Sequence, residues 1–239
     1  MESTGVKARG LPRCQNRLES DRADGARARP LAGTGGRTIW SAHVPDRSFL
    51  LVHGFNHHRP PGHWQYWLAD RLRARGEQVS YPGLPFEDDP RYEEWRRALR
   101  GELSAMTGER VVICNSLACL LWFRYATDLA AEDEPVDRLL LVSPPDSPQV
   151  PEKAASFRLD DVDGPAVRAS SRARIRIVCS DADPYNPGGA ERQYAATLGA
   201  EVDVIPGAGH IGPIEGYGPW PALEAWCVDP AQRVGPNFP

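Results

Sequence analysis

Three kinds of side chain in this sequence could together perform nucleophilic chemistry on an acyl group: Ser116, an aspartate at 181 or 183, and His210. A serine hydroxyl attacks poorly at neutral pH unless a base takes its proton. A histidine can be that base, and an aspartate can hold its tautomer and stabilise the imidazolium. Catalytic sets of a serine, an acid and a histidine occur in this order along the chain in one known class of enzymes. The set therefore predicts a reaction through an acyl-serine.

The sequence around Ser116 predicts an abrupt change from strand to helix. Val111–Cys114 is a short apolar run typical of a buried strand, and Leu117–Tyr125 has apolar residues at helical spacing. A nucleophile at such a turn needs small residues two positions away on either side, where glycine is usual. Here those residues are Cys114 and Ala118, both small. Taken alone, Ser116 would equally fit an ordinary helix cap.

The other candidate groups also follow predicted strands. Arg174–Ser180 ends at the two aspartates, and Glu201–Ile205 leads to His210. Open parallel sheets place their sites at the carboxyl ends of their strands. All of these groups are therefore expected at one edge of one sheet.

A further predicted strand, Ser48–Val52, ends in His53-Gly54-Phe55. A loop there can supply a backbone N–H, from Phe55 or Asn56, that would hold an oxyanion beside the N–H of Leu117.

Strands and helices alternate along the rest of the chain. The remaining expected strands are 79–81 and 136–142, and the expected helices are 63–75, 92–106, 117–131, 189–198 and 217–226. This alternation predicts an α/β protein of three layers, with a mostly parallel, doubly wound sheet. Ser147–Ala173 is irregular and polar, and is expected to form a small flap or covering loop, a minimal lid.

Length and composition fit one α/β domain with a sizeable core. The chain has 239 residues and a net charge of -4, which gives no electrostatic argument for a nucleic acid or an anionic membrane. No apolar run approaches a membrane span. The domain is expected to cover 38–228, between a flexible N-terminal tail, 1–37, and a C-terminal tail, 229–239. A small-molecule substrate is the expected partner, and the oligomeric state is left open.

Cysteines and paired histidines do not indicate a metal site. The five cysteines have no metal-ligand spacing, and Cys114, Cys119 and Cys179 are expected in the core, which favours a cytoplasmic protein. The pair His57-His58 is more typical of a solvated loop than of a metal centre. No metal and no cofactor are expected.

Several motifs resemble the small serine hydrolases of the α/β-hydrolase fold related to retinoblastoma-binding protein nine, especially bacterial members. The motifs lie between about Ser48 and Trp226: His53-Gly54, His63-Trp64 with Trp67-Leu68, Trp95 with Leu99, Asn115-Ser116-Leu117-Ala118, Ser143-Pro144-Pro145-Asp146, Ser180-Asp181-Ala182-Asp183-Pro184-Tyr185, Gly209-His210 and Gly216-Tyr217-Gly218-Pro219-Trp220-Pro221. The resemblance implies a compact sheet, a minimal lid and a Ser–Asp–His triad, but no particular substrate.

The resemblance also implies which aspartate is the triad acid. Asp183, directly before a proline, matches the family's catalytic aspartate, so Asp181 is expected either to cap a loop or to support the triad residues without reacting itself. The chain departs from the family's pattern at Asn115, where histidine is usual, and at Ala118, where glycine is usual. Neither departure removes a catalytic group.

The expected function is hydrolysis of a small carboxylic ester, or of a thioester or amide, by Ser116, Asp183 and His210. One alternative is an acyltransferase, cyclase or lyase of secondary metabolism with the same three groups. Another is an inactive binding protein on the same scaffold. His53, Asn115 and Tyr185 are the candidate pocket residues.

Overall fold

A parallel sheet of six strands forms the centre of the described domain. The computed structural model describes residues 47–129 and 133–237, so the N-terminal tail expected at 1–37 lies outside the described residues. The six strands have the order β2-β1-β3-β4-β5-β6, and every neighbouring pair is parallel. Their bounds are β1 Arg47–Val52, β2 Gln78–Ser80, β3 Glu109–Asn115, β4 Arg138–Val142, β5 Arg176–Ser180 and β6 Glu201–Ile205. Each predicted strand is present, so the prediction of an α/β protein with a parallel sheet is confirmed.

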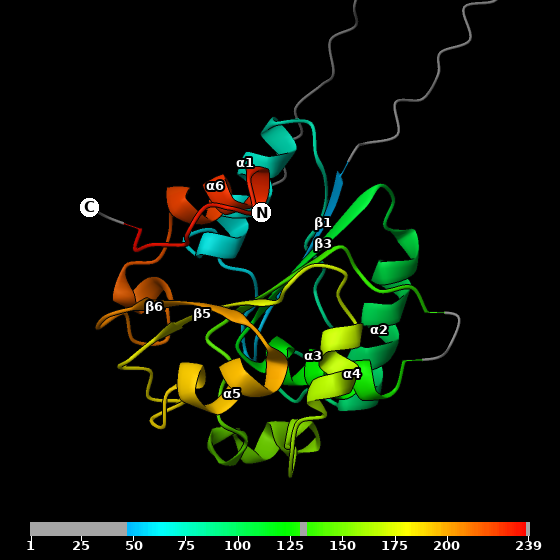
Figure 1. Ribbon diagram of the computed structural model, residues 1–239, viewed down its shortest axis with the longest axis vertical. Coiled ribbons are helices and arrows are strands. Elements are labelled where there is room, and N and C mark those ends of the chain that lie inside the picture. Colours follow the sequence, from blue (N-terminus) through cyan, green and yellow to red (C-terminus); the bar gives the residue numbers. More distant parts are fainter. Residues whose placement is uncertain (1–46, 130–132, 238–239) are drawn as a thin grey trace, which may run out of the picture. The chain divides into compact units, whose positions relative to one another are not determined.

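Helices cover both faces of the sheet, as Figure 1 shows. One face carries α1 (Trp64–Ala74) and α6 (Pro221–Val228). The other carries α2 (Tyr92–Ala105), α3 (Leu117–Thr127), α4 (Gly164–Ala169) and α5 (Ala190–Leu198). Because side chains alternate along a strand, Val111 and Ile113 of β3 enter the first core and Val112 and Cys114 the second. This double burial explains the uninterrupted apolar run in β3.

The carboxyl ends of the central strands come together beside Ser116. Val52 of β1 pairs with Cys114 of β3, and Asn115 pairs with Val142 of β4. The loops after β1, β3, β5 and β6 therefore open at the same edge of the sheet.

The segment 147–173, expected to be a flap or covering loop, is partly built into the core. It forms two 3₁₀ turns, Ser147–Gln149 and Glu152–Phe157, and then α4. Phe157 is fully buried, with its ring centroid 5.1 Å from that of Trp95. The Trp122 indole N–H donates to Ser170 Oγ at 3.0 Å, which fixes the far end of the segment.

Residues 229–237, assigned from the sequence to a C-terminal tail, pack against the domain without forming a helix or strand. Val234 is buried, and its N–H donates to Asp203 Oδ2 at 2.9 Å. The Trp220 indole N–H donates to the Gly235 carbonyl at 2.8 Å. Asp203 also pairs with Arg176 at 2.7 Å, so this segment completes a buried charged cluster at β5 and β6.

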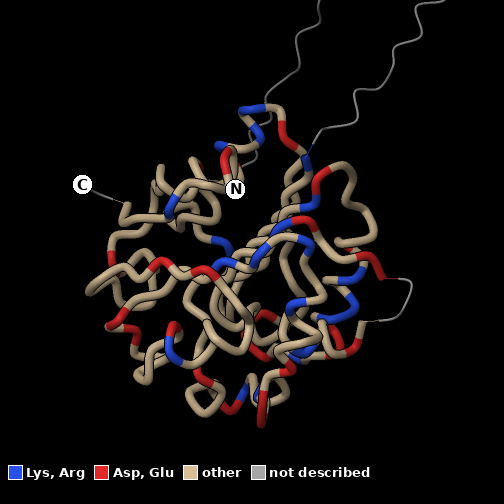
Figure 2. The backbone as a smooth tube through the Cα atoms, in the orientation of Figure 1, with Lys and Arg blue, Asp and Glu red and all other residues tan. Residues whose placement is uncertain are grey.

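Charged residues of both signs are interspersed along the described backbone (Figure 2). On α2, for example, Arg96 pairs with Glu93 and Arg97 with Glu94, each one helical turn apart. Such exposed pairs contribute little stability, so the two apolar cores provide most of it. Among the described residues, no helix is both long enough and apolar enough to cross a membrane.

Candidate active site

Ser116 occupies the sharp turn that the sequence predicts. Its backbone has φ 53° and ψ −120°, a conformation that a residue with a side chain rarely adopts. The turn is held because the Ser116 N–H donates to the Val142 carbonyl at 2.9 Å, while the Ser116 carbonyl accepts from Cys119 at 2.8 Å. The strained backbone is therefore fixed between β4 and the first turn of α3.

The loop after β1 approaches this turn very closely at Gly54. A Cβ atom placed on Gly54 would lie 2.8 Å from Ser116 Cβ and 3.3 Å from the Asn115 carbonyl oxygen. Side-chain carbons do not approach so closely, so only glycine fits at this position.

Ser116, His210 and Asp183 form a continuous chain of hydrogen bonds. His210 Nε2 is 2.8 Å from Ser116 Oγ, and His210 Nδ1 is 2.8 Å from Asp183 Oδ2. A carboxylate only accepts, so Nδ1 carries the proton and Nε2 accepts from the serine hydroxyl. Asp183 is only 4% exposed, and its Oδ1 also accepts from the Tyr185 N–H at 2.9 Å. The structure thus brings together all three groups expected from the sequence.

The second aspartate has a different position. Asp181 Oδ1 accepts from the Gly207 N–H at 2.7 Å, which ties the end of β5 to the turn after β6. It caps the loop that leads to His210, as expected for a loop-capping residue.

Two further residues fix the His210 loop, and sequence reasoning did not identify either of them in this position. Glu215 Oε2 accepts from the Gly212 N–H at 3.0 Å, and its side chain packs where a Cβ on Gly209 would lie. The Trp64 indole N–H donates to the Ile211 carbonyl at 3.0 Å. The available signal was Gly209, whose φ of 55° favours glycine, but a sequence does not reveal what occupies the space beside it.

The sequence left either Phe55 or Asn56 as the second candidate N–H donor to an oxyanion, and the hydrogen bonds of the two N–H groups differ. The Asn56 N–H donates to the Glu87 carbonyl at 3.0 Å and is therefore occupied. Within residues 47–129 and 133–237, the N–H groups of Phe55 and Leu117 have no hydrogen-bond partner. Leu117 begins α3, so its N–H lies at the positive end of a helix.

The three residues expected in a pocket wall differ in exposure. His53, expected in the pocket wall, is fully buried. Both of its ring nitrogens have backbone partners: Nδ1 lies 2.8 Å from the Gly54 carbonyl, and Nε2 accepts from the Leu84 N–H at 3.0 Å. It holds the loop after β1 and has no surface to offer a substrate. Asn115 is 6% exposed. Tyr185 is 45% exposed, with its ring centroid 4.5 Å from that of His210.

Three histidines cluster around this loop. The ring of His57 stacks on that of His53, with centroids 5.4 Å apart, and meets the ring of His63 edge-on at 4.2 Å. Burial, together with interactions with neighbouring histidines, lowers the pKa of His57 to about 2 and that of His63 to about 3; for His63 the main neighbour is His210. Burial also lowers the pKa of His53. All three are therefore neutral at neutral pH.

The expectation of a solvated His57-His58 pair is right for only one of the two. His58 is exposed and pairs with Glu87 at 2.9 Å and Asp88 at 2.8 Å, whereas His57 is half-buried in the ring cluster. In the part of the chain that the structure describes, no group of three or more His, Cys, Asp or Glu side chains could hold a metal ion.

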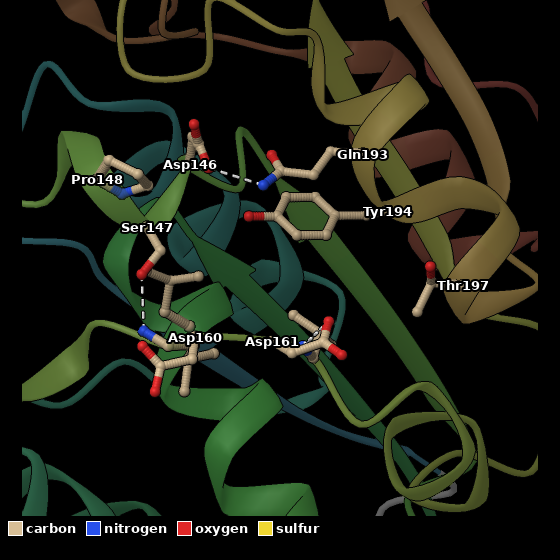
Figure 3. Close-up of a pocket in the computed structure, with 11 residues that line it drawn as sticks. Asp146, Ser147, Pro148, Asp160, Asp161, Gln193, Tyr194 and Thr197 are labelled. Atoms are coloured by element: carbon tan, nitrogen blue, oxygen red, sulfur yellow. Dashed lines mark hydrogen bonds between the residues drawn. The ribbon is translucent and has the colours of Figure 1, made fainter.

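A separate cavity of about 250 Å³ lies between the 147–162 segment and α5. Asp146, Asp160 and Asp161 contribute to its wall together with Tyr194, as Figure 3 shows. The lining does not include Ser116, Asp183 or His210. This cavity is therefore not the space above the nucleophile.

Comparison with known families identifies most of the domain. A family model described as serine hydrolase matches residues 49–227. YdeN of Bacillus subtilis is 22% identical over 171 residues, which cover 72% of this chain and 89% of YdeN.

Solved structures show the same fold. The structure of the ydeN product of B. subtilis has a TM-score of 0.66 at 21% identity, covering 76% of this chain and 97% of that one. A YdeN-like protein of Pectobacterium atrosepticum has a TM-score of 0.56 at 20% identity, covering 74% and 86%. A monoacylglycerol lipase of Paleococcus ferrophilus has a TM-score of 0.52 at 17% identity, covering 70% and 87%. These likenesses confirm the α/β-hydrolase fold.

Proposed function

The chain belongs to the serine hydrolase family, and we propose that it cleaves a small carboxylic ester through an acyl-serine intermediate. The observation that carries this proposal is the hydrogen-bonded chain from Ser116 Oγ through His210 to Asp183. In this chain the serine hydroxyl donates to the histidine and the histidine donates to the aspartate, which is the arrangement of a nucleophile, its general base and the group that orients the base.

The reaction begins when Ser116 Oγ attacks the ester carbonyl carbon and gives its proton to His210 Nε2. Asp183 stabilises the imidazolium that forms, because its carboxylate accepts from Nδ1. The N–H groups of Phe55 and Leu117 hold the negative oxygen of the tetrahedral intermediate. Losing one such donor typically costs about 2.7–4 kcal/mol in the barrier.

The intermediate then collapses, and His210 returns the proton to the leaving alcohol. A water molecule, deprotonated by His210, attacks the acyl-serine and releases the carboxylic acid. The same steps would cleave a thioester or an amide, with the ester as the first choice.

Within the family, we place this chain beside the hydrolases related to retinoblastoma-binding protein nine, on the motifs around His53, Asp183 and His210 given above. Cytoplasmic location stays a prediction of the sequence.

The test uses Ser143 as a matched control for Ser116. Ser143 also has a positive φ, of 47°, at the end of a neighbouring strand, but it is fully buried. Ser116→Ala should abolish both hydrolysis of p-nitrophenyl acetate and labelling by a fluorophosphonate probe, whereas Ser143→Ala should retain labelling. Labelling of Ser116→Ala to the wild-type extent would contradict the proposal.

The alternatives from the sequence would give other outcomes. A wild-type protein that is neither labelled nor active on esters would be a binding protein on this fold. Labelling with transfer of the acyl group to an added alcohol or amine, in place of release to water, would indicate an acyltransferase.

A further inference from the structure

The most exposed large apolar side chains of the described residues belong to loops that follow strands of the sheet, at the edge where the candidate site lies. Ile214 is 96% exposed, Phe86 is 65% exposed and Tyr185 is 45% exposed. Exposed apolar side chains are common singly, but a group of them beside a reactive centre often marks a binding surface. These three lie on the loops after β6, β2 and β5 respectively.

Phe86 belongs to a segment that is bound to the loop after β1. The next residue, Glu87, accepts the Asn56 N–H through its carbonyl, and Leu84 donates to the buried His53. The 84–87 segment is therefore bound to the loop that carries the Phe55 N–H. Phe86 also has φ 55°, so a bulky side chain is held exposed at some cost in backbone strain.

Tyr185 lies against His210. Its ring meets the imidazole at 4.5 Å, and its N–H donates to Asp183. Ile214 follows on the same loop as His210, in the 3₁₀ turn Pro213–Glu215.

The chemistry of the reaction determines which part of the substrate lies near His210 and which part lies away from it. His210 Nε2, which is 2.8 Å from Ser116 Oγ, must protonate the leaving oxygen, so the alcohol group of an ester lies over His210 and meets Tyr185. The acyl chain then extends away from His210, towards the loop after β1 and the 84–87 segment bound to it.

We propose that the substrate is an ester that is apolar on both sides of the scissile bond, with its alkyl acyl chain against Phe86 and its hydrophobic alcohol against Tyr185 and Ile214. This inference rests on the proposed esterase function and narrows its substrate class. Burying such apolar surfaces against a substrate is favourable because it removes them from water.

Two series of esters test the two sides independently. For the acyl side, p-nitrophenyl octanoate is compared with p-nitrophenyl acetate, which keeps the alcohol constant. For the alcohol side, benzyl acetate is compared with methyl acetate, which keeps the acyl group constant. The quantity measured is the ratio of kcat/KM within each pair.

Phe86→Asn should lower the octanoate-to-acetate ratio about tenfold and leave the benzyl-to-methyl ratio within twofold. Asparagine is chosen because it tolerates a positive φ, so it removes the ring without adding strain. Phe86→Leu should retain most of the ratio. Tyr185→Ser and Ile214→Ser should lower the benzyl-to-methyl ratio, whereas Tyr185→Phe should retain it.

Val204→Ser is the matched control, because Val204 is 41% exposed on the edge strand β6, and it should change neither ratio. Thermal melting of each variant checks the fold. The inference would be overturned if the wild type cleaved both members of each ester pair equally well, or if Val204→Ser changed the ratios as much as the other variants. The esterase proposal would still stand if Ser116 turned over p-nitrophenyl acetate. If the wild type cleaved none of the esters, both would fail.

Discussion

Gly54 and Ser116 approach so closely that a single methyl group on Gly54 would lie 2.8 Å from the Ser116 Cβ. The loop with the free Phe55 N–H and the strained turn with the hydroxyl are thus in contact at their backbones. This contact sets the distance between a nucleophile and the donor that would hold its oxyanion.

Gly54→Ala should therefore damage activity more than stability. The added methyl group has to displace either the loop or the Ser116 turn, and overpacking of this kind typically costs 1–3 kcal/mol of stability. We expect kcat/KM on p-nitrophenyl acetate to fall by about 100-fold or more, since small misplacements of reacting groups have large kinetic effects. Gly62→Ala is the control, because a Cβ there would meet no atom within 4 Å. Activity of Gly54→Ala within threefold of wild type would show that this contact does not set the site's geometry.

The two aspartates after β5 should differ sharply in their effects. Asp183→Asn replaces the acceptor of the His210 Nδ1 proton by an amide that favours the wrong tautomer, so kcat should fall about 10³–10⁴-fold. Asp181→Asn keeps an oxygen that can accept the Gly207 N–H, so its loss should be less than tenfold. Steady-state kinetics on one activated ester distinguish the two. A reversed ranking would show that the acid is wrongly assigned.

Acid should destabilise the protein through the histidines packed around the loop after β1. The pKa of His57 is lowered to about 2 by burial, so between about pH 6.5 and that value the unfolded chain binds a proton that the folded chain does not. Stability is therefore full above pH 6.5 and falls as the pH decreases, by up to about 1.4 kcal/mol per pH unit for such a histidine.

Replacing His57 by glutamine should make that pH dependence shallower. Urea unfolding between pH 7 and pH 4 measures the slope. His58→Gln is the control, since that exposed histidine should leave the slope nearly unchanged. An equal slope in wild type and His57→Gln would mean that His57 is protonated within the folded protein.

Deleting residues 230–239 should destabilise the domain. The deletion exposes the pocket of Val234 and removes the acceptor of the Trp220 indole N–H and a donor to the buried Asp203. Together these losses should amount to about 3 kcal/mol or more, which lowers Tm by about 6–12 °C in a domain of this size. Calorimetry on full-length and truncated protein measures the shift. An unchanged Tm would show that the segment is a tail, as its composition indicates.

The sequence predicted all six described strands and every described α-helix but α4, and where the reactive groups lie along them. The apolar runs in β1, β3, β4 and β5 are local patterns, and they are legible because a parallel strand is buried on both faces. Positions at strand ends then bring Ser116, Asp183 and His210 to one edge, since parallel strands share their carboxyl edge.

Tertiary structure alone decided which partner each polar group has. From the sequence, Asn56 and Phe55 were equally good candidates for the second oxyanion donor. The Asn56 N–H is bonded to the Glu87 carbonyl only because the 84–87 segment packs on the loop after β1. The same loop buries His53, although a histidine after a strand would also fit a pocket wall. Residues 229–237 have no periodicity, because their contacts are single side chains and backbone groups that fit Asp203 and Trp220. Such contacts join residues distant in the chain and leave no repeating pattern in the sequence, so they become visible only when the chain is folded.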